Sequence, residues 1–349
     1  MMATTLYERL QSDDPGVRRV AVLDLPYSDE ADDIVPLLVV ALSDPDACVR
    51  LEAAKAIEGY EEPDVLEALV PLLKDADPEV RRAAATTLAE LKEPASAPYL
   101  LPYLDDEEAS VRIAALHAIR ALRVEAAFEP AMQALDDPDA GVRREAVGVL
   151  GYLKKPEAIG ALTNAAANDP DQEVRRIAVG ALGYASAVSI QPTLSRVLAD
   201  PAWQVREEAA TTMGKLGLAL GVPDLVRAMD DEFWQVRVKA ARSLGKLKAK
   251  AAVQALCLAL QHPMSNLRKE AVIALGEIGD TRAIAHLELA LKDVDSDVRK
   301  LSKLALTTIQ LQGGASRHTS SANRASAAST PTACRCARSS ASMKARTSS

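Results

Sequence analysis

The chain has 349 residues, of which 48% are hydrophobic, 26% charged and only 3% aromatic, so its core must consist mainly of Ala, Leu, Val and Ile. No run of about 18 apolar residues occurs, which excludes a membrane-spanning helix, and residues 1–14 lack the pattern of a secretory signal. Six of the 41 Lys and Arg residues and none of the 49 Asp and Glu residues lie after Gln312, so residues 1–312 carry a net charge of −14. That acidity disfavours nucleic acid as a partner, and four scattered cysteines without a CxxC pair are typical of a cytoplasmic protein.

A Val-Arg dipeptide, once Leu-Arg, recurs along the chain at intervals of 31 or 32 residues. Its arginines are Arg18, Arg50, Arg81, Arg112, Arg143, Arg175, Arg206, Arg237, Arg268 and Arg299. An aspartate usually stands six residues earlier, as Asp44, Asp75, Asp106, Asp137, Asp169, Asp200, Asp231 and Asp293. Because Asp and the Pro that often follows it favour turns, each aspartate marks the point where one helix ends and the next begins.

Two short helices are predicted in each repeat. An alanine recurs three residues after the arginine, and a large apolar residue seven residues after it. A leucine recurs twelve residues before the arginine and another eight residues before it. This spacing indicates one apolar face per helix. Helices of about 11–13 residues are unstable alone in water, so neighbouring pairs must stack. We therefore predict an all-α fold, a right-handed α-solenoid of about ten two-helix repeats with a period of 31–32 residues.

The segment from Leu267 to Arg299, LRKEAVIALGEIGDTRAIAHLELALKDVDSDVR, resembles the HEAT-like repeats of phycobilisome lyases (PBS lyases). The resemblance covers about residues 5–311. It implies that the turn aspartates and helix arginines bond across neighbouring repeats as a ladder, from Asp44 and Arg50 to Asp293 and Arg299. His262-Pro263 replaces the turn aspartate once, and we expect the ladder to break there.

Residues 313–349 differ in composition from residues 1–312, the predicted solenoid domain. They are rich in Ser, Ala, Thr and Arg and contain no Leu, Ile or Val, so we expect a disordered tail that buries no core. Translation of a GC-rich gene in another reading frame gives a similar composition, a hypothesis that sequencing the 3′ end of the gene tests.

Residues that break the repeat pattern are the candidates for partner binding. Trp203 and Trp234 occupy the same place in consecutive repeats, three residues before the arginine. Stacked, exposed indoles at two helix starts are natural interface anchors. The alternative is that each indole covers a neighbouring turn.

Two further sets break the pattern. Tyr152 and Tyr184 lie nine residues after the arginine, with a glycine four residues before each ring, and either line a groove or pack between repeats. Lys239, Arg242 and Lys246 form a basic face on an acidic body, which either meets a carboxylate or phosphate or is merely solvated.

Motifs for catalysis are missing from the sequence. It contains no phosphate-binding glycine loop and no GxSxG elbow, and its histidines occur singly. Deoxyhypusine hydroxylases, a related HEAT-repeat family, bind two irons through His-Glu dipeptides, which this chain lacks, so the iron-binding oxidoreductase reading is disfavoured. We expect no catalytic residues, no metal and no cofactor, and interpret the chain as a scaffold or adaptor for a protein partner. The alternative is a bilin-handling protein, enzymatic only if similar to phycobilin lyases.

Overall fold

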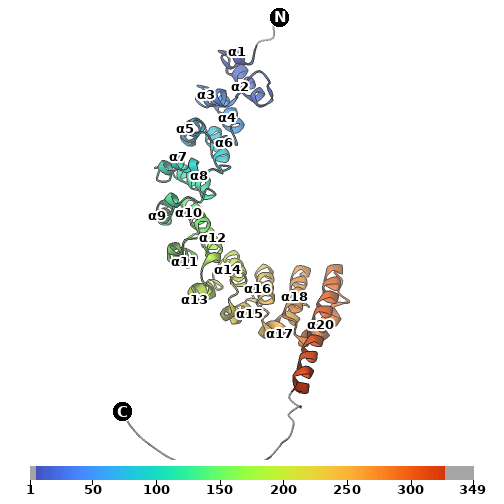
Figure 1. Cartoon of the computed structure of the whole chain (residues 1–349). Coiled ribbons are helices and arrows are strands. Elements are labelled where there is room, and N and C mark those ends of the chain that lie inside the picture. The colour runs from blue at the N-terminus through green and yellow to red at the C-terminus, as the bar shows by residue number, and fades with distance from the viewer. Residues whose placement is uncertain (1–4, 327–349) are drawn as a thin grey trace, which may run out of the picture.

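The computed structural model describes residues 5–326, and every regular element in that range is helical. Ten pairs of helices form a curved array with the second helix of each pair on its inner side (Figure 1). The first helices are α1 (Leu6–Leu10), α3 (Val35–Ala41), α5 (Pro63–Leu69), α7 (Ala97–Leu100), α9 (Phe128–Ala134), α11 (Ile159–Asn168), α13 (Ala187–Val197), α15 (Val222–Ala228), α17 (Val253–Ala259) and α19 (Ile284–Ala290). The second helices are α2 (Pro15–Asp24), α4 (Ala47–Ala56), α6 (Pro78–Leu88), α8 (Ala109–Arg120), α10 (Ala140–Leu153), α12 (Gln172–Ala181), α14 (Trp203–Lys215), α16 (Trp234–Lys246), α18 (Ser265–Ile278) and α20 (Ser296–Ser326). The prediction of an all-α solenoid of about ten repeats is confirmed.

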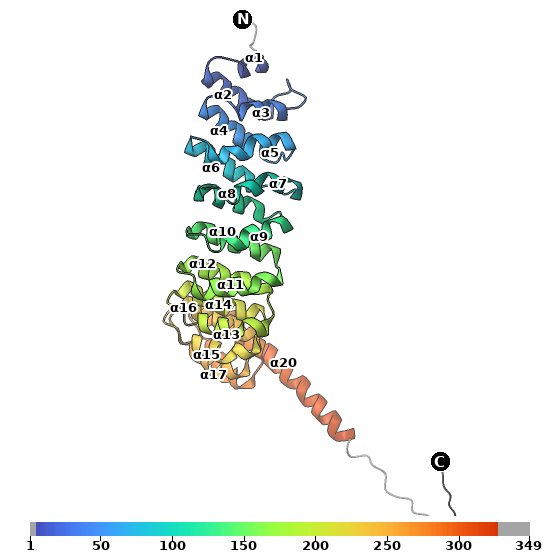
Figure 2. The same cartoon turned by 90° about the vertical axis from the view of Figure 1, so that its left-hand side faces the viewer.

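The core is a continuous apolar layer between the two rows of helices, and the stacking of the pairs is clearest in Figure 2. Eight of the ten first helices have a leucine twelve residues before the arginine, and all eight are fully buried: Leu6, Leu38, Leu69, Leu100, Leu194, Leu225, Leu256 and Leu287. The alanines three residues after it are fully buried in the second helices: Ala21, Ala53, Ala84, Ala115, Ala146, Ala178, Ala209, Ala240 and Ala271. Small side chains in these positions let neighbouring second helices approach closely, which explains a large core with few aromatic residues.

Bidentate ion pairs join most consecutive repeats at the turn between the two helices. Seven steps have an arginine whose Nε and Nη2 donate to the aspartate of the next repeat: Arg18–Asp44, Arg50–Asp75, Arg112–Asp137, Arg143–Asp169, Arg175–Asp200, Arg206–Asp231 and Arg268–Asp293. In each of these seven arginines, Nη1 also donates to backbone carbonyls of its own turn, for example Asp44 O at 2.8 Å from Arg50. The ladder thus satisfies the exposed ends of the first helices and connects the repeats.

Four of the ladder carboxyls have a lowered pKa, which favours their ionised form. Burial alone raises the pKa of Asp231, but hydrogen bonds from Arg206 and from the backbone N–H of Phe233 outweigh it, and the pKa lies below its ordinary value. The same balance lowers the pKa of three other ladder carboxyls, Asp44, Asp75 and Asp293. The ladder therefore contributes stability mainly where these carboxyls are ionised.

Four predicted members of the ladder do not form the bidentate pair: Arg81, Asp106, Arg237 and Arg299. Arg237 belongs to the step at which His262 replaces the aspartate. Asp106 accepts from Lys74 at 2.9 Å, and Arg81 donates only to backbone carbonyls, including that of Asp75. Lys74 directly precedes the turn and reaches the carboxylate of the next repeat, which the arginine then does not bind. Arg299 belongs to the last repeat, so within the described residues it has no following aspartate and donates to carbonyls of its own turn.

The first repeat has a short first helix. α1 has five residues, whereas α2 has ten, as many as α4. Pro26 opens a separate 3-10 turn after α2 and does not truncate that helix. At the other end α20 continues past the predicted boundary at Gln312 to Ser326, because extending a formed helix costs far less than nucleating one. The rest of the predicted tail, 327–349, lies outside the described residues.

Candidate functional site

A groove of about 510 Å³ lies on the inner side of the curve, across α8, α10, α12 and α14. Both predicted tyrosines line it, Tyr152 from the last turn of α10 and Tyr184 from the 3-10 turn Leu182–Tyr184 that follows α12. The structure therefore brings together two side chains that are one repeat apart, because a period of 32 residues places them at the same point of adjacent helices.

Two glycines make room for the groove, one on α10 and one on α12. A Cβ atom on Gly148 would lie 3.0 Å from Cδ of Arg120, and a Cβ atom on Gly180 would lie 3.0 Å from Oε1 of Glu208. Long polar side chains from the neighbouring helices therefore occupy part of the space beside the glycines. Any larger residue at either position would displace these side chains and narrow the groove.

The two tyrosines differ in how firmly they are held. The Tyr184 hydroxyl donates to the carbonyl oxygen of Lys155 at 2.8 Å, and burial together with the nearby Glu157 carboxylate raises the pKa of Tyr184. Tyr152 is 41% exposed, and the guanidinium groups of Arg120 and Arg123 lie 5.4 and 5.5 Å from its ring centroid. Tyr184 is thus a fixed wall of the groove, while the Tyr152 ring is available to a ligand.

Cationic residues stand where the backbone favours glycine. Arg123, Lys154 and Lys248 have left-handed backbone conformations, with φ of 53°, 54° and 49°. Each lies eleven residues after its ladder arginine, and two other repeats have Gly217 and Gly279 there, also with positive φ. A residue with a side chain costs about 1 kcal/mol more than glycine in this conformation. Three repeats therefore have a cationic residue in this strained conformation, and two of these residues, Arg123 and Lys154, lie beside the groove.

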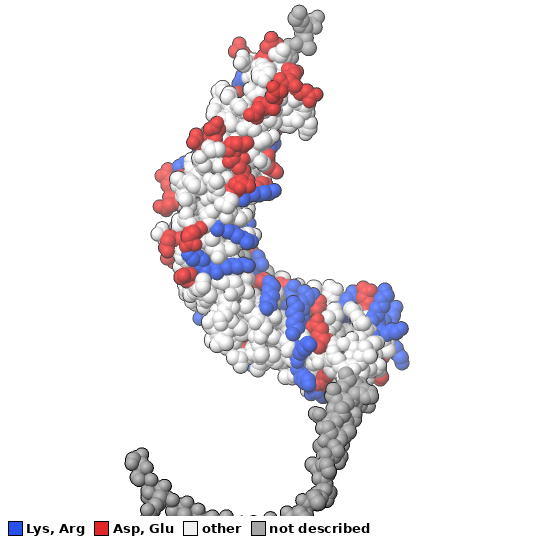
Figure 3. Space-filling view, viewed as in Figure 1, with Lys and Arg blue, Asp and Glu red and all other residues white. Residues whose placement is uncertain are grey.

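Positive charge predominates around the groove. Arg120 and Arg176 each lie within 4.0 Å of a glutamate of the next inner helix, whereas Lys154 and Lys215 have no ion pair among the described residues. Figure 3 shows Asp and Glu gathered on the N-terminal arm, and Lys and Arg along the inner side from the middle of the arc onward. A ligand of this groove would therefore meet one exposed aromatic ring and two unpaired ammonium groups.

The predicted tryptophan anchors are placed differently from the expectation. Trp203 and Trp234 are half-buried and pack against the core, and they do not stack on each other. Trp203 stacks on Phe233 of the next repeat, with ring centroids 5.6 Å apart. The expected pair of exposed indoles is therefore wrong. The repeat pattern did not predict this contact, because the partner of Trp203 is Phe233, a residue that does not recur at that position in the other repeats.

The predicted basic face lies on α16, outside the groove. Lys239 is 3.7 Å from Glu207, and Arg242 is paired with Glu270. Lys246 is exposed and has no ion pair among the described residues. The trio is thus largely neutralised by neighbouring repeats. The two groove cations that have no ion pair among the described residues, Lys154 and Lys215, were not among the predicted binding residues.

The described residues contain no group of three or more His, Cys, Asp and Glu residues arranged to hold a metal ion. In the same part of the chain, no helix is long and apolar enough to cross a membrane. The groove itself contains a single carboxylate, Glu208, and no histidine or cysteine. Its lining offers a ligand aromatic rings, cationic groups and aliphatic surface.

Stacked helix pairs that share one continuous core define an α-solenoid. The family model for HEAT repeats matches residues 3–75, 35–120, 100–183, 160–232 and 222–307, and the chain belongs to the HEAT repeat family. No curated protein matches the sequence.

Solved structures with a similar fold include karyopherins. Kap121p bound to the extreme C-terminus of the phosphatase Cdc14p is 16% identical with a TM-score of 0.62, over 87% of this chain and 41% of that one. Kap95p with RanGDP is 15% identical with a TM-score of 0.61, over 87% and 49%. Importin beta is 16% identical with a TM-score of 0.58, over 87% and 50%. This chain thus spans about half or less of each karyopherin, and the likeness is one of fold.

Proposed function

We propose that the protein is a non-catalytic scaffold or adaptor that binds a protein partner on the inner surface of its solenoid. The observation that carries the proposal is the groove between α10 and α12, where the Tyr152 ring is partly exposed and Lys154 and Lys215 have no ion pair among the described residues. The chemistry of these groups favours an acidic segment of the partner that carries an aromatic or apolar side chain.

Preorganisation supports this proposal. Tyr184 is fixed by its hydrogen bond to Lys155, and Arg120 lies over the exposed Tyr152 ring, so a partner would order few side chains on binding. The karyopherin neighbour Kap121p binds the C-terminus of Cdc14p, and a solenoid of the same fold offers a comparable extended surface.

The experiment is affinity capture with the full chain from its native lysate, compared with the Tyr152→Ala variant. Tyr27 stands at the equivalent position of the first repeat and is 89% exposed, so Tyr27→Ala is the matched control. Because an aromatic hot spot contributes about 2 kcal/mol, we expect Tyr152→Ala to weaken partner binding about 30-fold and Tyr27→Ala to leave it unchanged. A partner that binds wild type and Tyr152→Ala equally would contradict the inner groove as its site. Lys246→Ala tests whether the contact continues to α16.

A second candidate is a bilin-handling protein of the PBS lyase type. The observation that favours it is the same groove, whose volume, aromatic walls and guanidinium groups from Arg120 and Arg176 suit a flat conjugated ligand with carboxylates. Adding biliverdin to the purified protein tests it by the absorbance spectrum. A shifted spectrum that Arg120→Gln abolishes supports this function, and an unchanged spectrum counts against it.

A further inference from the structure

At one step of the ladder the turn between the two helices is formed as in the other repeats, but the aspartate that would bind the arginine is missing. Between the repeats of α16 and α18, His262 stands where the eight other steps have aspartate. The histidine keeps the local turn, because Met264 N–H donates to His262 Nδ1 at 3.1 Å, just as the N–H of Phe233 donates to Asp231 Oδ1 in the preceding repeat. Arg268 also donates to the His262 carbonyl oxygen at 2.9 Å. The turn is thus intact, and only the acceptor for the arginine is missing.

The arginine of this step is left without an ionic partner. Arg237 donates from Nε to the carbonyl oxygen of Asp231, and its Nη1 and Nη2 have no hydrogen-bond partner among the described residues. The Asp231 carboxylate is already bound by Arg206. His262 does not substitute for the missing anion: its Nδ1 already accepts a hydrogen bond. Burial and the charges of Arg237 and Arg268 lower the pKa of His262, which keeps the ring neutral.

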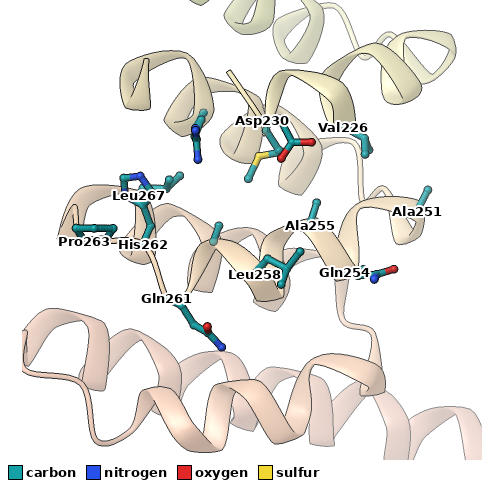
Figure 4. Close-up of a pocket in the computed structure, with 13 residues that line it drawn as sticks. Val226, Asp230, Ala251, Gln254, Ala255, Leu258, Gln261, His262, Pro263 and Leu267 are labelled. Carbon is teal, nitrogen blue, oxygen red and sulfur yellow. The ribbon is translucent and has the colours of Figure 1, made fainter. Parts of the chain in front are cut away.

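A cavity of about 450 Å³ lies beside this guanidinium, between α15 and α17. His262, Pro263 and Leu267 stand at one end of it, and Val226, Ala251 and Gln254 at the other (Figure 4). The middle of the wall is formed by aliphatic side chains, including Leu258 and Ala255. Asp230 also lines the cavity, but it forms no ion pair with Arg237.

The equivalent groove three steps away is the internal comparison. It lies between α9 and α11, has the same volume of about 450 Å³, and its arginine, Arg143, is held by Asp169 through Nε and Nη2. The difference between the two grooves is therefore the availability of the guanidinium. Of these two grooves, only the one between α15 and α17 has an arginine without a carboxylate partner among the described residues.

We propose that this groove receives an acidic side chain of a partner protein, whose carboxylate binds Arg237 and completes the ladder between two molecules. The seven steps with a bidentate pair define the required chemistry, a carboxylate that accepts from Nε and Nη2 of the arginine. In this groove the carboxylate must stand on a short aliphatic stem that packs on Leu258. Because Arg237 Nε now donates to a carbonyl, binding requires a rotation of its guanidinium. The inference rests on the proposed scaffold function and names the chemistry of one contact outside the inner groove.

The probe is a capped pentapeptide, acetyl-Ala-Leu-Asp-Leu-Ala-amide, and its matched control is the same peptide with Asn in place of Asp. Binding to the full chain is followed by NMR through the Nε–Hε signals of isotope-labelled arginine. The Arg237→Gln variant identifies the Arg237 signal, because that signal is missing from its spectrum. We expect the Asp peptide to shift the Arg237 signal and the Asn peptide to bind at least about tenfold more weakly.

The decisive variant is His262→Asp, which supplies the missing carboxylate within the chain. We expect it to weaken binding of the Asp peptide at least about tenfold and to raise the unfolding midpoint, which shows that the pair has formed. Equal binding of the two peptides to the wild type, or undiminished binding of the Asp peptide to a stabilised His262→Asp variant, would overturn the proposal. The inner groove is tested separately by Tyr152→Ala, so failure of the peptide leaves the proposed function standing.

Discussion

Replacing one ladder aspartate by asparagine should measure how much the ladder stabilises the fold. Asp231 accepts from Arg206 Nε at 2.7 Å and Nη2 at 2.9 Å, and from the N–H of Phe233 at 2.9 Å. Asparagine keeps the size and one carbonyl acceptor, so Asp231→Asn removes the charge with little change in shape. The adjacent Asp230 is exposed and has no ion pair among the described residues, so Asp230→Asn is the control for a change of net charge.

The magnitude follows from burial and from the bonds that remain. Both side chains of the pair are only 10% exposed, and breaking a buried pair costs about 3–5 kcal/mol, against about 0–1 kcal/mol for a surface pair. Arg206 keeps its bonds to the carbonyls of Asp200 and Pro201 and stays 5.7 Å from the Phe233 ring, so its charge is not fully orphaned. We expect Asp231→Asn to lower the free energy of unfolding by about 2 kcal/mol.

The assay is urea unfolding followed by circular dichroism at 222 nm, with hydrogen exchange to locate the loss. Exchange should accelerate first in α14 and α16, which the pair connects, because solenoid repeats are stabilised by their neighbours. If Asp231→Asn and Asp230→Asn both stay within about 0.5 kcal/mol of the wild type, the ladder does not stabilise the array and the reasoning is refuted.

Three other changes have outcomes that the structure specifies. Lys154→Gly should raise the free energy of unfolding by about 0.5 kcal/mol, because it relieves a left-handed lysine, yet weaken partner binding; unfolding and titration with the captured partner measure both, and unchanged affinity would show that the cation has no role. Gly245→Ala should cost about 1–3 kcal/mol, because its Cβ would lie 2.8 Å from Cα of Ala274, whereas Gly160→Ala on α11 meets nothing within 4 Å and should gain about 0.5 kcal/mol. The pKa values of the four ladder carboxyls named above lie below their unfolded value of about 3.9, so their contribution is complete above that pH and is lost as the pH falls through the folded pKa. Unfolding free energy measured against pH should therefore drop steeply below about pH 4, less so in Asp231→Asn, and a flat profile would contradict this.

The inner groove shows how far sequence reasoning reached. Tyr152 and Tyr184 were predicted as a pair because they share a register position, and the structure places both on the wall of one groove. Lys154 and Lys215, which have no ion pair among the described residues, were not predicted. They lie eleven and nine residues after the arginine of their repeats, and a lysine on a solvent-facing position carries no signal of a groove until the helices are stacked. Trp203 was misplaced for the same reason, because its partner Phe233 belongs to the next repeat.

The sequence by itself determined the repeat, its two helices and its buried faces, because the 31- to 32-residue period repeats the same local signals and the same apolar spacing in every unit. Only the tertiary structure showed where charges depart from the expected ladder and what lies beside them. Lys74 takes the place of an arginine at Asp106, and Arg237, at the break expected from His262, lies beside a cavity. The physical reason is that local periodicity fixes the direction of a side chain on its own helix, whereas its partner is set by the stacking of a repeat about 31 residues away.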